Sequence, residues 1–317
     1  MNKRIVVTGG CGYIGSHVAK AFVQAGATVM IIDRVHRPHT LAGIDQFYEL
    51  DFVDSLGVIR EYQPHVIVHC AGTSLVGPSV LDPAEYYDNN IAKTIKLLNF
   101  VRDFKQKPLI MFSSSASVYG EPESVPIAES AKTNPISPYG NTKLMTESIL
   151  QDYYTAYGIT SICFRYFNAA GAALTHDLGQ EPGATHIVAR ALEASINQTT
   201  FTINGNDFNT PDGTCIRDYV HVWDIAQAHI KGSDWMMNNP GASVFNLGTN
   251  AGVSNQQIAD YVRTHYGLID VQYGDKRPGD PATLISDATV ARTKLNWEPV
   301  HSDISTIIDT AHKWYTR

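Results

Sequence analysis

The amino-acid sequence predicts an α/β fold in which a doubly wound parallel sheet is joined to a smaller, mixed α/β lobe. Its first half alternates continuous Val- and Ile-rich runs with helical patterns, as in parallel strands covered by helices on both faces. Beyond residue 168 these runs give way to tracts rich in Gly, Pro and Asp. We therefore place the sheet domain at residues 1–168 and the lobe mainly at 169–317, with the chain rejoining the sheet at about 223–248.

Five apolar runs in the first half are predicted strands, and a predicted helix follows each of the first four. The strands are RIVVTG, TVMIID, HVIVHCAG, LIMFSSS and SICFRYF, and the helices cover Ser16–Gln24, Asp54–Glu61, Glu85–Phe104 and Tyr139–Tyr157. Further helices are expected at about 186–197, 223–237, 254–266 and 302–316, and the run SVFNLG at 243–248 is a strand that could return to the main sheet. This order is that of a Rossmann-type sheet, which binds its ligand at the carboxyl ends of its strands.

Composition restricts the class of protein. The chain has 317 residues, of which 44% are hydrophobic and 17% charged, as in soluble globular proteins. No apolar stretch is long enough to span a bilayer, and the N-terminus runs directly into a strand, so we expect a cytoplasmic protein without a membrane partner. The formal charge of −7 argues against a non-specific nucleic-acid binder. An anionic ligand would need a local cradle.

The cysteines and histidines form no recognisable metal-binding pattern. Cys11, Cys70, Cys163 and Cys215 lack C-x-x-C spacing, and three of them lie in or beside apolar runs. Buried, reduced thiols are therefore expected rather than disulfides. The 12 histidines are dispersed along the chain, and we expect no metal.

A glycine-rich turn joins the first predicted strand to the first helix. In VVTGGCGYIGSH, Gly9, Gly12 and Gly15 allow a tight turn and a close approach of a pyrophosphate to the helix N-terminus. The second strand ends at Asp33, whose carboxylate can accept both ribose hydroxyls of an adenosine and would repel a 2′-phosphate. The sequence therefore predicts NAD, while Arg34 leaves NADP open because a guanidinium could hold that phosphate.

Tyr139 and Lys143 lie one helical turn apart, after the helix-starting pair Ser137-Pro138. A tyrosine that acts as a base near pH 7 needs its pKa lowered by roughly three units. The ammonium of Lys143, an oxidised nicotinamide and the helix N-terminus could each favour the phenolate. The serine-rich strand end at Ser113–Ser117 offers a hydroxyl to share the proton.

Several motifs together resemble the extended short-chain dehydrogenase/reductase family and, more narrowly, its UDP-glucose (UDP-galactose) 4-epimerases. These motifs are TGGCGYIGS, SSSASVYGE, SPYGNTK, RYFNAAGA, YYDNN, GNDFNTPDGTCIRDYVHV and KRPGDPA. The resemblance implies an isomerase with tightly bound NAD that epimerises C4 of a UDP-hexose through a transient 4-keto sugar. It also implies Tyr139 as the base, Ser115 as the group that hydrogen-bonds the 4-oxygen, and Lys143 as the residue that holds the ribose and lowers the tyrosine pKa.

The residue patterns and the resemblance together give the expected ligand contacts. Expected at the cofactor are Gly9, Gly12, Tyr13, Ile14, Gly15, Asp33, Arg34, Asp51, Phe52, Cys70, Ala71, Gly72, Ser74, Asn89, Ser113, Tyr139, Lys143, Tyr166 and Phe167. Expected at the UDP-sugar are Thr73, Ser115, Ala116, Ser117, Tyr139, Asn168, Thr185, His186, Thr202, Asn204, Arg217, Arg277, Asp280 and Leu284. Family members are often homodimers joined through two long helices, here Glu85–Phe104 and Tyr139–Tyr157.

The chain departs from the family pattern at three places. Ser74 stands where many members carry lysine, the segment between Asp33 and Asp51 is short, and Leu284 falls near a gate residue that differs among members with different sugars. Epimerases of UDP-GlcNAc, UDP-glucuronate or a UDP-pentose therefore remain alternatives, as does an NAD-sensing regulator on the same scaffold. A 4,6-dehydratase is disfavoured because Ala116 and Ser117 occupy the place of the acid that such enzymes need.

Overall fold

The computed structural model describes residues 3–267, 270–277 and 280–317. Its centre is a seven-stranded sheet in the order β11-β6-β5-β4-β1-β2-β3, and all of its strand pairs are parallel. The strands are β1 (Arg4–Thr8), β2 (Thr28–Asp33), β3 (Gln46–Glu49), β4 (Val66–His69), β5 (Leu109–Ser115), β6 (Ser161–Tyr166) and β11 (Ala242–Leu247). The Rossmann-type doubly wound sheet is thus confirmed, and β11 is its last strand beside β6.

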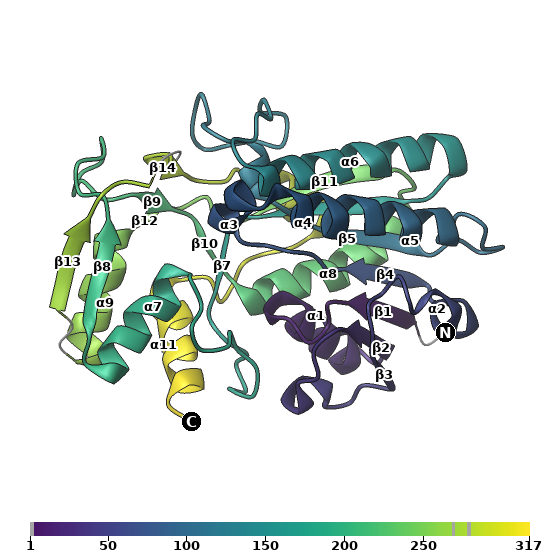
Figure 1. The fold of residues 1–317 in the computed structure, drawn as a ribbon, viewed down its shortest axis with the longest axis horizontal. Helices are drawn as coiled ribbons and strands as arrows, with labels where there is room; N and C mark the ends of the chain where they lie inside the picture. The colour runs from purple at the N-terminus through teal and green to yellow at the C-terminus, as the bar shows by residue number, and fades with distance from the viewer. Residues whose placement is uncertain (1–2, 268–269, 278–279) are drawn as a thin grey trace.

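Helices cover both faces of this sheet (Figure 1). One face carries α1 (Tyr13–Gln24) and α8 (Val222–Met236), and the other carries α2 (Leu56–Tyr62), α5 (Lys93–Val101) and α6 (Pro138–Tyr157). Two apolar layers result, one around Val18 and Ile225 and the other around Leu97 and Leu150. This arrangement accounts for the uninterrupted apolar strands, since both faces of the sheet are buried.

The expected helix Glu85–Phe104 is not a single regular helix. It begins with α4 (Pro83–Tyr87), passes through a π-helical turn over Asp88–Ala92 and continues as α5 to Val101. Before it lies α3 (Val76–Leu81), which the sequence pattern did not predict. Turns of π-helix frequently occur at functional sites because they re-aim side chains, and this one places Asn89 and Asn90 in the interior.

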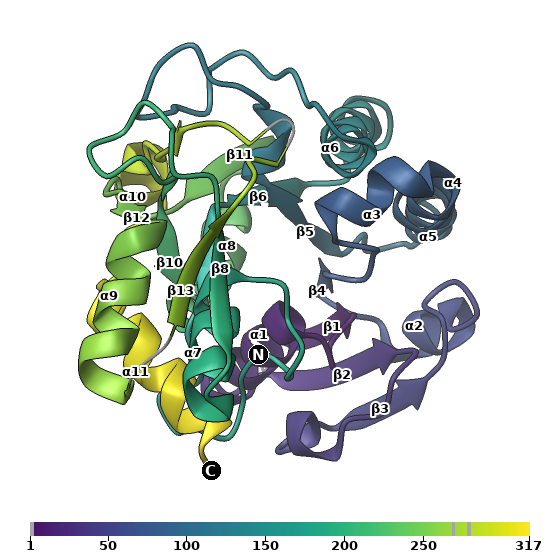
Figure 2. The same cartoon turned by 60° about the vertical axis from the view of Figure 1, so that its left-hand side comes forward.

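The smaller lobe lies beside the carboxyl ends of the sheet strands (Figures 1 and 2). Its helices are α7 (Ile187–Asn197), α9 (Asn255–Tyr266) and α11 (Ile304–Tyr315), whereas α10 (Thr289–Leu295) packs against α8 and β11 of the sheet domain. Its short sheets pair β7 (Asn168–Ala170) with β10 (Tyr219–His221), β8 (Thr200–Asn204) with β13 (Asp270–Gly274), and β9 (Ile216–Arg217) with β12 (Val253–Ser254) and β14 (Thr283–Leu284). A separate apolar cluster, which includes Leu192, Phe201 and Ile308, forms the core of the lobe.

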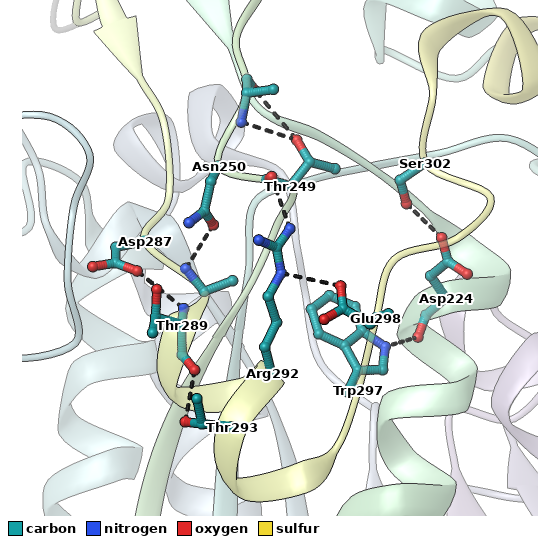
Figure 3. A network of polar contacts seen from close by, with 12 residues as sticks. Asp224, Thr249, Asn250, Asp287, Thr289, Arg292, Thr293, Trp297, Glu298 and Ser302 are labelled. Carbon is teal, nitrogen blue, oxygen red and sulfur yellow. Dashed lines mark hydrogen bonds and ion pairs between the residues drawn. The ribbon is translucent and has the colours of Figure 1, made fainter.

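Polar contacts attach the segment around α10 to the sheet domain (Figure 3). Asp224 of α8 accepts hydrogen bonds from Trp297 through its main-chain oxygen at 2.8 Å and from Ser302 through its carboxylate at 2.6 Å. Arg292 donates to the main-chain oxygen of Thr249, just after β11, at 3.0 Å. These bonds hold the C-terminal part of the lobe at the end of the sheet.

Two further observations concern the cysteines and the length of the helices. All four cysteines are free, and Cys11, Cys163 and Cys215 are buried. None of the helices in the described ranges is long and apolar enough to cross a membrane.

Candidate active site

A cleft of about 580 Å³ follows the carboxyl ends of the central strands and reaches the lobe. It brings together most of the residues that the sequence predicts at a ligand. Those lining it are Gly9, Gly12, Tyr13, Ile14, Gly15, Asp33, Arg34, Asp51, Phe52, Cys70, Ala71, Gly72, Ser74, Asn89, Ser113, Ser115, Ala116, Ser117, Tyr139, Lys143, Tyr166, Phe167, Asn168, His186 and Leu284. Also lining it, and not expected from the sequence, are Ile32, Arg37, Leu50, Val76, Ser114, Ala169 and Gln180.

The glycine turn at the start of α1 has room for a ligand but none for side chains. A Cβ on Gly15 would lie 2.2 Å from the main-chain oxygen of Gly9, and one on Gly9 would lie 2.7 Å from the main-chain nitrogen of Ala71. Gly9 also has φ of +71°, in the left-handed region, which glycine adopts without strain. Gly12 caps α1 without a side-chain hydrogen bond. The N–H groups at the helix start can therefore bind a pyrophosphate, and the turn fits NAD.

Asp33 is held at the tip of β2 by main-chain donors. Its Oδ2 accepts from the nitrogen of Cys11 at 2.9 Å and its Oδ1 from the nitrogen of Val35 at 3.0 Å. Each carboxylate oxygen keeps a lone pair for a ribose hydroxyl. Arg37 lines the same part of the cleft and donates to the main-chain oxygen of Cys11 at 2.8 Å.

Lys93 connects two of the expected cofactor contacts and was missed by the sequence reasoning. Its ammonium donates to Oδ2 of Asp51 and to Oδ1 of Asn89, both at 2.8 Å. Burial acts to raise the pKa of Asp51, but the hydrogen bonds from Lys93 and the main chain of Val53, with the charges of Lys93 and Arg34, together hold that pKa below its ordinary value. Asp51 is therefore an ionised acceptor at neutral pH, and the amide of Asn89 has a fixed orientation.

Thr73, which was expected at the UDP-sugar, does not line the cleft but hydrogen-bonds to residues behind it. Its main-chain nitrogen donates to Oδ1 of Asn90 at 2.8 Å, and its hydroxyl accepts from the amide of Asn89 at 3.0 Å. Asn90 also donates to the hydroxyl of Thr142 on α6 at 3.0 Å. The π-helical turn thus joins the small-residue loop after β4 to the helix that carries Lys143.

Tyr139 and Lys143 project from the first turns of α6. Ser137 caps this helix by accepting from the nitrogen of Gly140 at 3.1 Å, and Pro138 is its first residue. Tyr139 and Lys143 both line the cleft opposite Ser115, which ends β5. The ammonium of Lys143 lies 4.8 Å from the ring centre of Phe112 and 5.5 Å from that of Tyr139.

The expected low pKa of Tyr139 does not arise from the protein alone. Burial raises the pKa of its hydroxyl to about 12, and a hydrogen bond with Ser115 opposes the rise only in part. Burial also lowers the pKa of Lys143 to about 8. In a buried site both charged forms are costly, so near pH 7 the tyrosine is neutral and the lysine is charged.

A buried chain of hydrogen bonds runs from the cleft toward α8. The hydroxyl of Ser113 lies 3.1 Å from the sulfur of Cys70 and 3.0 Å from the hydroxyl of Tyr166, which in turn lies 3.0 Å from Nε2 of His229. Burial lowers the pKa of His229 to about 4, so the ring is neutral. This chain fixes the orientation of three polar groups at the wall of the cleft.

The nucleotide end is less complete than the cofactor end. Of the residues expected there, Asn168, His186 and Leu284 line the cleft, whereas Thr185, Thr202, Asn204, Arg217, Arg277 and Asp280 do not. Arg217 is buried, donates to the main-chain oxygen of Ile216 at 2.9 Å and lies 3.9 Å from Asp280. Pro278 and Gly279, within the KRPGDPA motif, lie outside the described residues.

Arg190 of α7 adds a cation to this end that the sequence reasoning missed. It donates to the main-chain oxygen of Thr202 at 3.3 Å. Burial and the nearby charge of Arg277 lower its pKa. Among the described residues, neither Arg190 nor Arg277 forms an ion pair with a carboxylate. An anion bound here would relieve their mutual repulsion.

Comparison with known proteins identifies the relatives of this chain. A family model described as GDP-mannose 4,6 dehydratase matches residues 6–309. A UDP-glucose 4-epimerase from Lactobacillus helveticus is 41% identical over 98% of this chain and 97% of its own. The crystal structure of UDP-glucose 4-epimerase from Brucella ovis in complex with NAD is 37% identical, covers 98% of this chain and 97% of its own, and has a TM-score of 0.93.

A second solved structure carries ligands of both kinds. The UDP-glucose 4-epimerase from Bifidobacterium longum, in complex with NAD⁺ and UDP, is 32% identical over 99% of this chain and 98% of its own, with a TM-score of 0.91. The family model carries the description of a dehydratase. This chain has Ala116 and Ser117 where a dehydratase would need an acidic residue. With its glycine turn, its tyrosine–lysine pair and full-length relatives of one kind, the chain belongs to the UDP-glucose 4-epimerase family of the extended short-chain dehydrogenases/reductases.

Proposed function

We propose that this cleft interconverts UDP-glucose and UDP-galactose by epimerisation at C4 of the sugar. The observation that carries the proposal is the convergence of Ser115, Tyr139 and Lys143 on one cleft with the Gly9–Gly15 turn. NAD is the cofactor of this family, and when bound it supplies a hydride acceptor that becomes the donor for the return step. The reaction is an isomerisation, so no external reductant is consumed.

Tyr139 is the proposed base for the sugar 4-hydroxyl. Its hydroxyl has a hydrogen bond with Ser115, so a sugar oxygen beside both groups can pass its proton to the tyrosine. Loss of this proton and of the 4-hydride would give a 4-keto sugar, which rotates in the cleft. The hydride would then return to the opposite face of C4, while Tyr139 gives its proton back to the 4-oxygen. Lys143 remains protonated below its pKa of about 8, and its charge favours the phenolate.

The remaining contacts divide along the cleft. We assign the glycine turn and Tyr13 to the pyrophosphate of NAD, Asp33 to the adenosine ribose, and Asp51 with Phe52 to the adenine. We assign the nicotinamide end to the loop Cys70–Ser74 and to the following residues: Asn89, Ser113, Tyr166 and Phe167.

For the UDP-sugar, we assign the diphosphate to Arg217, Arg277 and Asn168. Thr202 and Asn204 are proposed to line the uridine site, and Leu284 the sugar. A diphosphate suits two guanidinium groups because each can donate two parallel hydrogen bonds. Thr185, His186 and Asp280 complete the proposed set, and Ala116 and Ser117 border the sugar beside Ser115.

The proposed unit of function is a cytoplasmic homodimer joined through the α4–α5 and α6 helices. Exposed apolar side chains lie on α3, which packs against α4 and α6, and on α6 itself: Leu81 is 88% exposed, Val80 62% and Met145 43%. Exposed apolar side chains favour association where they gather on one surface. Residues 1–168 with about 223–248 would bind NAD, and the rest of 169–317 the nucleotide-sugar. Sedimentation should give twice the chain mass of 34.8 kDa.

An activity panel tests the assignment of the sugar. Purified protein is incubated without added reductant with UDP-glucose, UDP-GlcNAc, UDP-glucuronate or UDP-xylose, and the nucleotide-sugars are separated by chromatography. We expect conversion of UDP-glucose to UDP-galactose at the highest kcat/KM. If UDP-glucuronate or UDP-xylose is converted and UDP-glucose is not, the assignment of the sugar is wrong. If the protein binds NAD but converts none of these nucleotide-sugars, the result favours an NAD-sensing regulator.

A further inference from the structure

The stripe of α6 that carries Tyr139 and Lys143 continues, one turn further, to Glu147. Residues at this spacing share one face of a helix. The carboxylate of Glu147 accepts from Nε of Arg165 at 3.0 Å and from Nη2 at 2.6 Å, and the two side chains are each 6% exposed. A two-point ion pair therefore fastens the helix of the proposed site to β6.

The same carboxylate also bonds the neighbouring strand. The hydroxyl of Ser114 donates to Oε1 of Glu147 at 2.5 Å, and Ser114 immediately precedes Ser115 on β5. On the other side, Arg165 donates to the hydroxyl of Tyr119 at 2.8 Å. These bonds set the position of α6 relative to Ser115. Of the bonds named here, each one that ends on α6 ends on Glu147.

We propose that Glu147 and Arg165 are positioning residues for the epimerisation. Their ion pair fixes α6 against β5 and β6, and the negative charge of Glu147, partly balanced by Arg165, stabilises the ammonium of Lys143. The inference rests on the roles proposed above for Tyr139 and Lys143, and it adds two residues that touch neither cofactor nor sugar.

The electrostatic part of the proposal follows from the groups around Lys143. Burial raises the pKa of the Cys70 and Cys163 thiols and lowers that of His69 to about 3, so these groups are uncharged near pH 7, as is Tyr139. The ionisable groups facing Lys143 are Tyr139 and Glu147 from α6, His69 and Cys70 at the end of β4, and Cys163 from β6, with Arg165 behind Glu147. Of these, only Glu147 carries a negative charge that stabilises the ammonium.

Two substitutions of the pair should move the pH dependence in opposite directions. Glu147→Gln leaves the charge of Arg165 unopposed, so Lys143 loses its proton more easily and the alkaline limb of kcat moves down by about one pH unit. Arg165→Gln leaves the charge of Glu147 unopposed, and the limb moves up by a similar amount. The KM for UDP-glucose should stay within about threefold in both, because neither residue touches the substrate.

A purely structural role would give a different result. Both substitutions break the same ion pair, so both should lower the melting temperature. The proposal would be overturned if the alkaline limb of kcat moved in the same direction in both variants, or did not move. Each variant has its own predicted direction of shift. If one variant fails to fold, the pH profile of the other still tests the proposal. Tyr119→Phe removes the bond that Arg165 donates to the Tyr119 hydroxyl at 2.8 Å without changing a charge, and it should lower the melting temperature with the limb unmoved. If Lys143→Met retains full activity, the proposed site itself fails, whatever the two shifts show.

Discussion

Replacement of Tyr139 by phenylalanine gives the sharpest test of the proposed base. With the pKa raised to about 12, forming the phenolate at pH 7 costs about 7 kcal/mol in the protein alone, at 1.36 kcal/mol for each of five units. General base catalysis contributes roughly 10²–10⁴ in rate, and a phenyl ring can accept no proton. We therefore expect kcat to fall by at least about 10³-fold, within the range expected for this loss.

The assay is the interconversion of UDP-glucose and UDP-galactose followed by chromatography, with bound NAD measured by its absorbance after release. Tyr86→Phe is the matched control, because its ring packs edge-on against that of Tyr139 at 6.4 Å and its hydroxyl bonds the main-chain oxygen of Leu75. We expect the control to keep kcat within about threefold, while both variants keep NAD. A Tyr139→Phe enzyme within tenfold of the wild type would refute the assignment.

Three further predictions concern the cofactor and the nucleotide. Gly15→Ala places a Cβ 2.2 Å from the main-chain oxygen of Gly9, so the purified protein should lose NAD, whereas Gly57→Ala, with open space around it, should keep it in the same absorbance assay. The pKa of Lys143 is lowered to about 8, so its ammonium is present below that pH and lost above it, and the kcat of the NAD-loaded protein should fall as pH rises through 8; an unchanged kcat up to pH 9.5 would contradict this. Arg217→Gln should raise KM for UDP-glucose about 10- to 100-fold with a smaller change in kcat, and initial rates over a range of substrate concentrations would show it.

The cofactor end of the cleft could be predicted from the sequence because its signals are local. Gly9 directly follows β1, Gly15 lies in the first turn of the next helix, and Asp33 ends β2. Parallel strands bring their carboxyl ends to one edge of the sheet. Arg37 and Lys93 could not be found in this way. Arg37 lies in an irregular segment after β2, and Lys93 faces Asp51 only because a π-helical turn precedes it. A 3.6-residue pattern contains no signal for such a turn.

The lobe was harder to predict because its contacts join distant segments. Arg190 reaches Thr202 from α7, and its proximity to Arg277 depends on the pairing of β8 with β13. The short helices α3 and α10, which pack in the sheet domain, were missed for another reason: they fall below the length at which periodicity separates a helix from a loop. Residue types at the nucleotide end could be matched to the family, but their distances from the cleft follow from tertiary packing.

The difference between the expected and the observed behaviour of Tyr139 has a mechanistic consequence. Burial raises the pKa of Tyr139 to about 12 and lowers that of Lys143 to about 8, so both groups resist becoming charged. A positive charge bound in the cleft lowers both values, because it favours the phenolate and disfavours the ammonium. Without NAD, Tyr139 is therefore held as a neutral phenol near pH 7. A phenolate able to take the sugar proton forms readily only when the oxidised cofactor is in place. A protonated Lys143 then matters most, and that is the condition that Glu147 is proposed to secure.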